Sequence, residues 1–493
     1  MPTSDIIAAL PLDRDAAEPV FRQLYAQIKS AILRGALDPG MRLPPTRALC
    51  AMLRISRQTV LNAYDQLMAE GYLQGSVGKG TFVSAQLPIS AGAASPTAAR
   101  GLMRPLSARG QRYAGAMGTV RYHEGPLRAF RVSMPALELF PFDVWSRLEA
   151  RRWRHPDHHM GYGDPAGYAP LRELLCVYLR ASRGVNCTPE QIVITSGSQQ
   201  ALYLLTQLLL APADGVWVES PGYQGLSAPL FAGGARVCTV PVDAGGMDVA
   251  YGAAHYPDAK MVFTTPSHQL PLGVTMTLAR RLELLQWAGA RRAWIIEDDY
   301  DSEYRYTGPP LASLQSLDRN DCVIYVGTLS KVLFPGLRLG YIVAPPALVE
   351  PLVRAKSLID RHNAIVPQMV LADFMGEGHF GRHIRRTRDA YGERRQALLA
   401  AIERRLADDL RLAPSDSGLD LCVHFRRARD ELAVVRAALE HGVEMRPLCY
   451  YAHPGASAAC ATAPGLLLGF SAIAPPQIAH GVELLARVLA ATR

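Results

Sequence analysis

Apolar residues recur at helical spacing in the first part of the chain. Within residues 19–33 they fall on one stripe of a helix, and Gly35 ends the pattern. The stripe consists of Phe21, Leu24, Tyr25, Ile28 and Ile32. This spacing predicts an amphipathic helix that packs against further elements.

Two shorter helical patterns follow a turn-rich stretch at residues 37–45. We expect Thr46 to cap a helix that runs through Leu53, and Ser56 to cap a second helix that runs to about Glu70. Two short helices joined this closely form a helix-turn-helix. Two short strands around a glycine-rich tip, within residues 71–83, would then form a wing.

The pattern changes from about residue 130 onward, where short apolar runs alternate with helical segments. Such an alternation indicates a mostly parallel sheet that is covered on both faces. The clearest runs are residues 191–195, 215–219, 261–265, 293–297 and 322–326. We therefore predict a large α/β domain after the helix-turn-helix.

Residues 84–119 separate these two regions and are rich in Ala, Gly, Ser, Pro and Arg, without an apolar period. This composition is typical of a flexible linker. The whole chain has 493 residues, a length that corresponds to roughly two to four domains.

The formal net charge of +8 is confined to the first 131 residues. Residues 1–83 contain nine Lys and Arg against seven Asp and Glu, and residues 84–131 contain seven Arg against one Glu. The charges of the remaining residues balance. A basic N-terminal region indicates a polyanionic partner, and the alternative is an Arg-rich linker that is simply solvated.

The sequence contains no feature of a membrane or secreted protein. No run of about 18 apolar residues occurs, and the first ten residues lack the basic and apolar regions of a signal peptide. The eight cysteines include no CxxC pair and no metal-ligand spacing. We expect a cytoplasmic protein with reduced cysteines, no membrane association and no bound metal.

Polar residues cluster on the first half of the second short helix, the part of a recognition helix that meets base edges. They are Arg57, Gln58, Thr59 and Asn62. Arg and Gln can make bidentate contacts to guanine and adenine respectively. Lys79, at the tip of the wing, can reach phosphate or the minor groove.

This region resembles the winged helix-turn-helix of GntR-type bacterial transcription regulators. The matching motifs are Leu43-Pro-Pro-Thr-Arg47, Ser56-Arg-Gln-Thr-Val60, Ala63-Tyr64, Glu70-Gly-Tyr-Leu73 and Gly78-Lys-Gly-Thr-Phe-Val83. The resemblance implies that Arg47, Arg57, Thr59 and the wing face double-stranded operator DNA. Ser76 departs from the Arg that this family often carries in the wing. The alternative is a small helical domain that binds only protein.

The strongest chemical motif lies in residues 325–341, at the end of an apolar run. Lys331 is one of only five lysines in the chain; Thr328 and Ser330 precede it and Arg338 follows it. A lysine in this context can form a Schiff base with an aldehyde cofactor, and hydroxyls with a guanidinium suit a phosphate. The alternative is a surface lysine in a polar loop.

Three carboxylates and a phenol end another apolar run, at Glu297, Asp298, Asp299 and Tyr300. Ligands bind at the C-terminal ends of parallel strands, and a carboxylate there can hold a pyridine nitrogen protonated. Calcium or magnesium is the metal alternative, but the spacing does not match an EF-hand loop.

Two further turns follow predicted strands. Thr195-Ser-Gly-Ser-Gln-Gln-Ala-Leu202 reads as a strand, a small-residue turn and a helix, whose first N–H groups can receive a phosphate. Glu219-Ser-Pro-Gly-Tyr223 presents an aromatic ring after a strand. The alternatives are an ordinary strand-to-helix turn and a tyrosine packed on the surface.

Together these motifs resemble the pyridoxal 5′-phosphate (PLP)-dependent aminotransferases of fold type I across about residues 130–490. That fold has a mostly parallel sheet and a C-terminal α+β subdomain. The resemblance implies that Lys331 forms the Schiff base and Asp298 pairs with the pyridine nitrogen. It further implies that Tyr300 bonds the ring oxygen of PLP and that Tyr223 stacks on its ring.

The resemblance also extends to the phosphate of PLP. It implies phosphate ligands at Ser198, Gln199, Ser330 and Arg338. Tyr162 resembles the tyrosine that reaches this phosphate from the other subunit, so we expect a homodimer with shared sites. The remaining alternative is a degenerate domain that has lost the cofactor.

A GntR-like winged helix followed by an aminotransferase-like domain is the layout of MocR/GabR-type regulators. The resemblance implies a DNA-binding domain at residues 18–86, a linker at 87–130 and a PLP-binding domain at 131–490, with a C-terminal subdomain from about 370. His268-Gln-Leu-Pro-Leu-Gly273 resembles the regulators' version of a turn. Working aminotransferases place Asn before this proline, where the chain has Leu270.

Two arginines that the resemblance would supply are missing. Aminotransferases hold a substrate carboxylate with an Arg near the C-terminus, at a position that corresponds to Leu467. The GABA-responsive member has a further Arg at the position of Gly225. Without them a carboxylate would be buried unpaired; Arg446 is a candidate substitute whose place the sequence does not give.

We therefore hypothesise a transcriptional regulator that senses PLP itself, or an amine, rather than one that turns over amino acids. Vitamin B6 synthesis, which PLP-sensing members control, and amine metabolism are candidate targets. Ligand binding would shift the arrangement of the dimer, and the linker would transmit this to the DNA-binding domains. The alternatives are an active aminotransferase with an accessory DNA-binding module, and a nucleic-acid-binding protein whose large domain only holds the dimer together.

Overall fold

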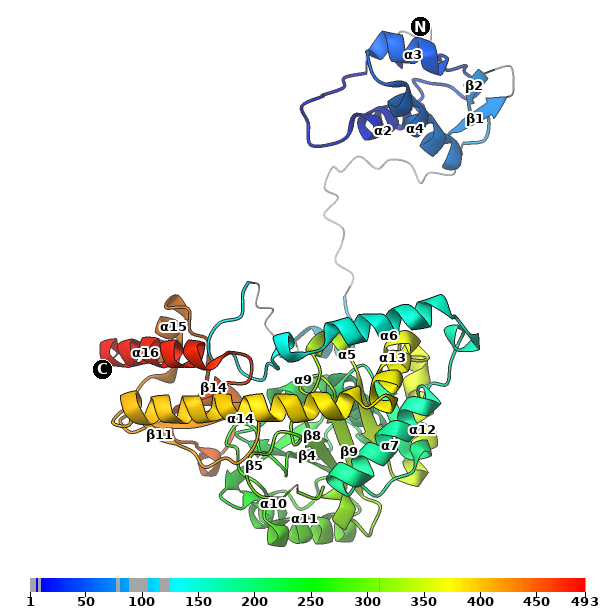
Figure 1. The fold of residues 1–493 in the computed structure, drawn as a ribbon. Helices are drawn as coiled ribbons and strands as arrows, with labels where there is room; N and C mark the ends of the chain where they lie inside the picture. Colours follow the sequence, from blue (N-terminus) through cyan, green and yellow to red (C-terminus); the bar gives the residue numbers. More distant parts are fainter. Residues whose placement is uncertain are drawn as a thin grey trace. The chain divides into compact units, whose positions relative to one another are not determined.

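The computed structural model describes residues 6–7, 10–76, 80–87, 105–115, 125–309 and 311–492. The chain divides into two compact units, Met1–Pro105 and Leu106–Arg493 (Figure 1). Each unit has a hydrophobic core of its own.

Three helices and a two-stranded ribbon form the N-terminal unit. They are α2 (Val20–Leu33), α3 (Thr46–Leu53), α4 (Arg57–Ala69), β1 (Leu73–Ser76) and β2 (Gly80–Val83). Leu24 of α2, Leu49 of α3 and Leu67 of α4 are fully buried in one core. β1 and β2 pair antiparallel, with Leu73 opposite Val83. The winged helix-turn-helix predicted from the sequence is confirmed.

The two caps predicted for this motif have different outcomes. Ser56 caps α4, because its Oγ accepts a hydrogen bond from the N–H of Thr59 at 3.1 Å. The prediction for Thr46 is wrong: Pro45 holds the cap position, and Thr46 is the first residue of α3. The N–H that proline lacks is no loss at a helix start, where the first N–H groups have no partner within the helix.

An eight-stranded sheet forms the centre of the large unit, in the order β3-β10-β9-β8-β7-β4-β5-β6. Strands β9, β8, β7, β4 and β5 run parallel, whereas β10 is antiparallel to both its neighbours and β6 is antiparallel to β5. The strands are β3 (Ile192–Thr195), β4 (Gly215–Ser220), β5 (Arg236–Asp243), β6 (Gly246–Met247), β7 (Met261–Thr264), β8 (Trp294–Asp299), β9 (Val323–Thr328) and β10 (Gly340–Val343). The predicted mostly parallel sheet is confirmed, and the five apolar runs correspond to β3, β4, β7, β8 and β9.

Helices cover both faces of this sheet (Figure 1). Neighbouring residues of β4 enter different cores: Val216 and Val218 pack with Leu202 of α8, and Trp217 packs with Leu284 of α11. This alternation explains why the strands are apolar throughout. The helices of this part are α6 (Phe142–Arg154), α7 (Ala169–Arg183), α8 (Ser198–Leu209), α9 (Ser227–Gly233), α10 (Val249–His255), α11 (Leu278–Arg291), α12 (Pro346–Asp360) and α13 (Ile365–Gly376).

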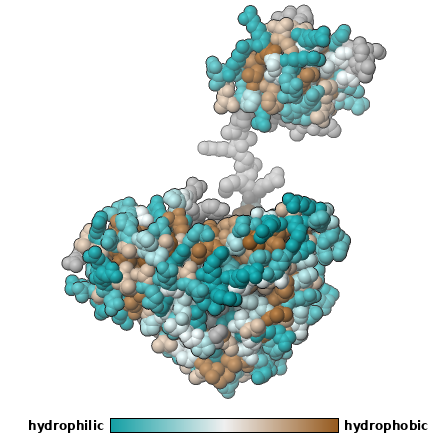
Figure 2. Space-filling model, in the orientation of Figure 1, coloured by the Kyte–Doolittle hydropathy of each residue, from teal (hydrophilic) through white to brown (hydrophobic). Residues whose placement is uncertain are grey.

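The surface of the large unit is mostly hydrophilic on the face that Figure 2 shows, where apolar residues occur in scattered patches. In the described parts of the chain, no helix is both long enough and apolar enough to span a membrane. All eight cysteines are free thiols.

A second, smaller sheet forms the C-terminal subdomain. It is antiparallel, in the order β11-β12-β14-β13. Figure 1 shows the long helix α14 extending from the region of α13 to this sheet. The elements are α14 (His379–Leu406), β11 (Leu410–Leu412), β12 (Asp420–Phe425), α15 (Glu431–Glu440), β13 (Arg446–Pro447), β14 (Gly465–Gly469) and α16 (Pro475–Ala491). The predicted α+β subdomain is confirmed.

The stretch predicted as a linker, residues 87–130, contains ordered structure that its composition does not reveal. Helix α5 (Ala108–Gly115) packs on α9, and the hydroxyls of Tyr113 and Tyr203 lie 2.9 Å apart. Phe130 is fully buried in the C-terminal subdomain and pairs with Gly469 of β14. The linker boundaries stay a prediction; within the described part of this stretch, Tyr113 and Phe130 contact residues far along the chain.

Truncating Phe130 should destabilise the large unit strongly. Phe130→Ala leaves a cavity among fully buried neighbours, so we expect it to lower the free energy of unfolding by about 3–5 kcal/mol. Phe231→Ala is the matched control, since Phe231 is 50% exposed, and should cost about 1 kcal/mol or less. Urea unfolding of both variants measures this. Equal midpoints would contradict the inclusion of Phe130 in the core.

Candidate functional site

Lys331 lies in the turn after β9, at the C-terminal edge of the parallel strands. The turn is tight, since the N–H of Ser330 donates to Thr328 Oγ1 at 3.2 Å. Lys331 Nζ donates to the backbone carbonyl oxygen of Ser133 at 2.8 Å. Burial lowers the pKa of Lys331, and the nearby carboxylates oppose this only in part. A lowered pKa favours the neutral amine, which is the nucleophilic form.

A cavity of about 470 Å³ opens beside Lys331. It is lined by eight of the nine residues predicted from the sequence to bind a cofactor. These are Ser198, Gln199, Tyr223, Asp298, Tyr300, Ser330, Lys331 and Arg338. They belong to the ends of β8 and β9, the loop after β4 and the start of α8, so the C-terminal edge of the parallel strands builds the site.

Asp298 is a buried carboxylate near the end of β8. Its Oδ1 has no hydrogen-bond partner in the described part of the chain. Burial, followed by the charges of Asp299, Glu219 and Asp301, raises the pKa of Asp298 to about 7. A buried carboxylate oxygen without a partner is costly, so this position suits a ligand that brings a cationic N–H donor.

Tyr300 lies two residues after Asp298, and a hydrogen bond to His268 orients its side chain. Its hydroxyl donates to the carbonyl oxygen of His268 at 3.0 Å. His268 Nδ1 in turn lies 3.0 Å from both carboxylate oxygens of Asp301. Burial lowers the pKa of His268, but the Asp301 charge outweighs it and the net shift is upward. The phenol is thus fixed in orientation at the wall of the cavity.

Part of the cavity lining is suited to an anion. Helix α8 begins at Ser198, and Ser198 and Gln199 of its first turn line the cavity together with Arg338. Arg338 Nη2 donates to the carbonyl oxygen of Ser196 at 2.7 Å. Gly197 has a positive φ of 91°, and a side-chain carbon there would lie 3.3 Å from the Arg338 guanidinium. A residue larger than glycine at position 197 would therefore crowd the Arg338 guanidinium and strain the backbone.

Tyr162 is the ninth predicted residue, and it does not line this cavity. Its side chain is 86% exposed. Within its own chain it lies beside Arg361, whose guanidinium is 5.3 Å from the ring centroid. The part predicted for Tyr162, contact with the phosphate from another subunit, stays a prediction.

Arg446 is a residue of the site that the sequence could not place. It lies on β13 directly opposite Leu467 of β14, and it lines the cavity. Its guanidinium lies over the ring of Tyr450, 4.9 Å from the centroid. A guanidinium therefore lines the cavity from the strand next to Leu467, and only the strand register reveals this arrangement.

The two other departures from the aminotransferase pattern are also placed by the structure. Leu270 lines the cavity and presents an apolar side chain. Gly225 lies against the stacking tyrosine: a side-chain carbon there would come within 2.1 Å of the Tyr223 ring. An arginine at Gly225 would therefore require Tyr223 to move.

Ser133 and Asp420 are two further residues that sequence reasoning missed. Both carboxylate oxygens of Asp420 accept hydrogen bonds from Ser133, one from its N–H at 2.7 Å and one from its Oγ at 2.9 Å. Neither residue belongs to a motif, and nearly 290 positions separate them in the chain. No sequence signal pairs them.

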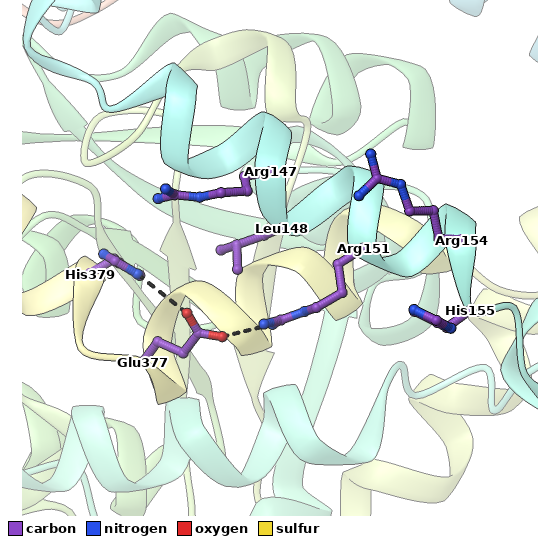
Figure 3. Close-up of a pocket in the computed structure, with 7 residues that line it drawn as sticks. All are labelled: Arg147, Leu148, Arg151, Arg154, His155, Glu377 and His379. Carbon is purple, nitrogen blue, oxygen red and sulfur yellow. Dashed lines mark hydrogen bonds and ion pairs between the residues drawn. The ribbon is translucent and has the colours of Figure 1, made fainter.

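A separate basic cavity of about 320 Å³ lies between α6 and the start of α14 (Figure 3). Its lining comprises Arg147, Leu148, Arg151, Arg154, His155, Glu377 and His379. Glu377 pairs with Arg151 at 2.7 Å and with His379 at 3.4 Å. No residue predicted from the sequence lies there, and none of the lining offers a lysine nucleophile.

The described residues that the sequence predicts to read DNA lie on helices α3 and α4 of the N-terminal unit. Arg47 near the start of α3, and Arg57, Gln58 and Asn62 on α4, are exposed. Thr59 is half-buried, and its hydroxyl lies 2.7 Å from that of the cap residue Ser56. Lys79 lies outside the described residues. The exposed first half of α4 fits the geometry of a recognition helix.

Comparison with known proteins assigns both units. The family of bacterial regulatory proteins called gntR matches residues 21–83, and aminotransferase class I and II matches residues 141–461. The large unit is similar to a kynurenine aminotransferase of Pyrococcus horikoshii (TM-score 0.67, 29% identity, 74% of this chain and 91% of that one). It is equally similar to LysN, an α-aminoadipate aminotransferase of Thermus thermophilus (TM-score 0.67, 31% identity, 74% and 92%).

Full-length relatives combine the two units as this chain does. The probable rhizopine catabolism regulatory protein MocR of Rhizobium meliloti is 40% identical over 97% of this chain and 95% of its own length. The pyridoxine biosynthesis transcriptional regulator PdxR of Corynebacterium glutamicum is 31% identical over 90% and 92%. The regulator TauR of Rhodobacter capsulatus is 34% identical over 77% and 79%. This chain belongs to the MocR-type family of HTH transcriptional regulators, in which a GntR DNA-binding domain is fused to an aminotransferase-like domain.

Proposed function

We propose that this transcriptional regulator binds PLP at Lys331 and that the ligand in this cavity sets its affinity for operator DNA. The observation that carries the proposal is the buried Asp298 Oδ1, which has no partner in the described residues and lies at the cavity that holds Lys331. A protonated pyridine nitrogen is a fitting partner for such an oxygen.

The residues around the cavity fit the other groups of PLP as well. When bound, PLP supplies an aldehyde for covalent attachment to the lysine and an electron-withdrawing ring. Tyr300 lines the same cavity, and its hydroxyl would turn from the His268 carbonyl oxygen to an oxygen on that ring. Ser198, Ser330, Arg338 and the N-terminus of α8 supply donors for a phosphate. Tyr223 lies at the same cavity and can cover the ring.

We infer that the effector is either PLP itself or an amine that reacts with it. The sequence disfavoured a carboxylate-bearing effector because two arginines were missing. Arg446, which shares the cavity with Lys331, removes the main reason for that ranking, since it can pair with a carboxylate. An amine that also carries a carboxylate is therefore an equal candidate.

We propose a homodimer in the cytoplasm as the working form. Tyr162 is accompanied on the surface by two exposed apolar side chains at the end of α12, Leu358 (88% exposed) and Ile359 (52% exposed). Exposed apolar residues of this kind mark interfaces. A second copy that covers them would bring Tyr162 towards the phosphate end of a neighbouring cavity.

We propose that vitamin B6 synthesis is a candidate target, because the relative PdxR is named for pyridoxine biosynthesis. A catabolic operon is the alternative, because the relative MocR is named for rhizopine catabolism. The DNA upstream of the protein's own gene is the first operator to test in either case.

Addition of PLP should give the wild-type protein a visible absorbance band that differs from that of free PLP. Lys331→Ala should lack this band, because no other lysine lines the cavity. Lys260→Ala is the matched control on an exposed lysine and should keep the band. Absence of the band from wild-type protein, or its persistence in Lys331→Ala, would contradict the proposal that PLP binds at Lys331.

Arg57→Ala should weaken operator binding about 5- to 150-fold, corresponding to roughly 1–3 kcal/mol for a base-reading arginine. Arg22→Ala removes an exposed arginine from α2 and should stay within about twofold of wild type. Fluorescence anisotropy with the upstream DNA and a scrambled duplex measures both affinities. An equal loss in the two variants would show that Arg57 contributes charge rather than recognition.

Arg446→Ala should keep the PLP band but lose its response to amines that carry a carboxylate. The guanidinium is the cation that such a group would need in this cavity, and losing a charge-assisted pair costs about 1.5–3 kcal/mol. Arg427→Ala, at an exposed arginine of the same subdomain, should respond as wild type does. Spectral titration with γ-aminobutyrate and other amines tests this. An unchanged response in Arg446→Ala would show that Arg446 does not hold the carboxylate.

Steady transamination by the wild-type protein would instead support an active aminotransferase. The same titrations detect it, because turnover consumes an added keto acid acceptor.

A further inference from the structure

The chain enters the large unit through a segment that also forms a wall of the cavity. Residues 125–136 are the first described stretch after α5, and the N-terminal unit precedes both. Val132, Ser133 and Met134 of this segment line the cavity beside Lys331. A ligand at Lys331 is therefore next to the part of the chain that leads back to the DNA-binding unit.

Ser133 is the point of direct contact. Its carbonyl oxygen accepts the hydrogen bond from Lys331 Nζ, while its N–H and Oγ donate to the two oxygens of Asp420 on β12. The carbonyl oxygen, the N–H and the hydroxyl of Ser133 thus each take part in a hydrogen bond. Asp420 is 6% exposed, so these bonds are shielded from water and are worth more than surface bonds.

The backbone of Ser133 is in a conformation that a serine rarely adopts. Its φ is 59°, in the left-handed region that favours glycine. Such a conformation is strained and persists only where surrounding contacts hold it. The Asp420 carboxylate and the Lys331 amine are the groups that hold it here.

We propose that Asp420 and Ser133 are positioning residues for the Lys331 amine, and that they couple occupation of the cavity to the segment at residues 125–136. This inference rests on the proposed function, since it assumes that PLP attaches to Lys331. Asp420 does not line the cavity; it contacts Ser133, and Ser133 contacts the Lys331 amine, so both act through Lys331.

Attachment of PLP changes what Lys331 can offer to Ser133. The amine nitrogen replaces the aldehyde oxygen, which leaves as water, and a C=N bond forms. The neutral amine has two hydrogens, and both leave with that oxygen. The nitrogen of the C=N bond, when unprotonated, would have no hydrogen to donate to the carbonyl oxygen of Ser133, and one of the two contacts that hold the strained backbone would be lost.

Contacts on both sides of Ser133 would carry such a change into the surrounding structure. Downstream, Ala136 is buried and its N–H donates to Tyr391 at 2.8 Å. Upstream, Phe130 is fully buried and the Arg131 guanidinium pairs with Glu444 at 2.8 Å. A shift at Ser133 would therefore disturb the packing of this segment against the C-terminal subdomain.

Asp420 also acts on the charge of the amine. Several titratable groups face Lys331 or Asp420 in the cavity walls: Asp298, Tyr300 and Asp301 of β8 and the turn after it, His268 of the preceding loop, and Tyr451 after β13. Burial lowers the pKa of Lys331, and the Asp420 charge is the largest opposing effect. Removing that charge lowers the pKa further, so neutral amine becomes available at lower pH.

The test compares Asp420→Asn, Ser133→Ala and the matched control Asp416→Asn in the full-length protein. Asp416 is an exposed carboxylate of the same subdomain. The pH profile of PLP attachment, followed by absorbance, should move to lower pH in Asp420→Asn alone. The ratio of operator affinities with and without PLP should fall to within about twofold of one in Asp420→Asn and decrease in Ser133→Ala, from a wild-type coupling of about 5- to 150-fold. Asp416→Asn should match wild type in both measurements.

The outcomes separate the proposal that the protein senses PLP from the proposal that Asp420 and Ser133 couple the cavity to residues 125–136. If wild-type operator affinity ignores PLP although the absorbance band forms, the sensing function fails, and the pH profile alone still tests the positioning of Lys331. If wild type responds and both variants keep the wild-type ratio and pH profile, the coupling inference is overturned. If Asp420→Asn binds no PLP, Ser133→Ala decides, because it keeps the charge and the backbone bonds; an unchanged ratio there overturns the inference.

Discussion

The burial of Asp298 is the constraint on which the site depends, since its Oδ1 has no hydrogen-bond partner among the described residues. Burying an unpaired ionised carboxylate is costly, and burial raises the pKa of Asp298 to about 7. The carboxylate lies at the C-terminal edge of five parallel strands, in the same cavity as Lys331. Under the proposed function, a cationic ring nitrogen would pair with this oxygen.

The physical properties of the two units differ in accordance with their roles. The N-terminal unit is a three-helix core that exposes arginine and amide side chains on α4, so its polar surface is available to DNA. The large unit has a covered sheet, its charges balance from residue 132 onward, and its polar chemistry is enclosed. Residues 129–136 of the large unit pack with the C-terminal subdomain, and Ser133 among them contacts Lys331. The family relationship supplies the regulatory role, and we propose this segment as a physical route for it.

Much of this architecture could be predicted from the sequence because its signals are local. Apolar runs that end near Asp298 and Thr328 indicated which polar groups lie at strand ends. Helix α4 could be predicted from the helical spacing of its apolar residues and from its cap residue, Ser56. Arg446 could not be predicted as a site residue, because only the pairing of β13 with β14 shows that it stands opposite Leu467. Ser133 was missed for the same reason, since its partners Lys331 and Asp420 are distant in sequence. The composition of residues 87–130, rich in Ala, Gly and Arg, did not predict helix α5. This helix contacts α9, and its sequence shows no regular spacing of apolar residues.

The most direct test of this account is a linkage measurement on the wild-type protein. Operator affinity and the fraction of PLP bound, followed by absorbance, are measured over the same series of PLP concentrations. The account predicts that operator affinity changes along the same saturation curve as PLP binding and that saturating operator shifts the PLP affinity by the same factor, as linkage requires. A PLP saturation curve that is complete while operator affinity stays constant would contradict it.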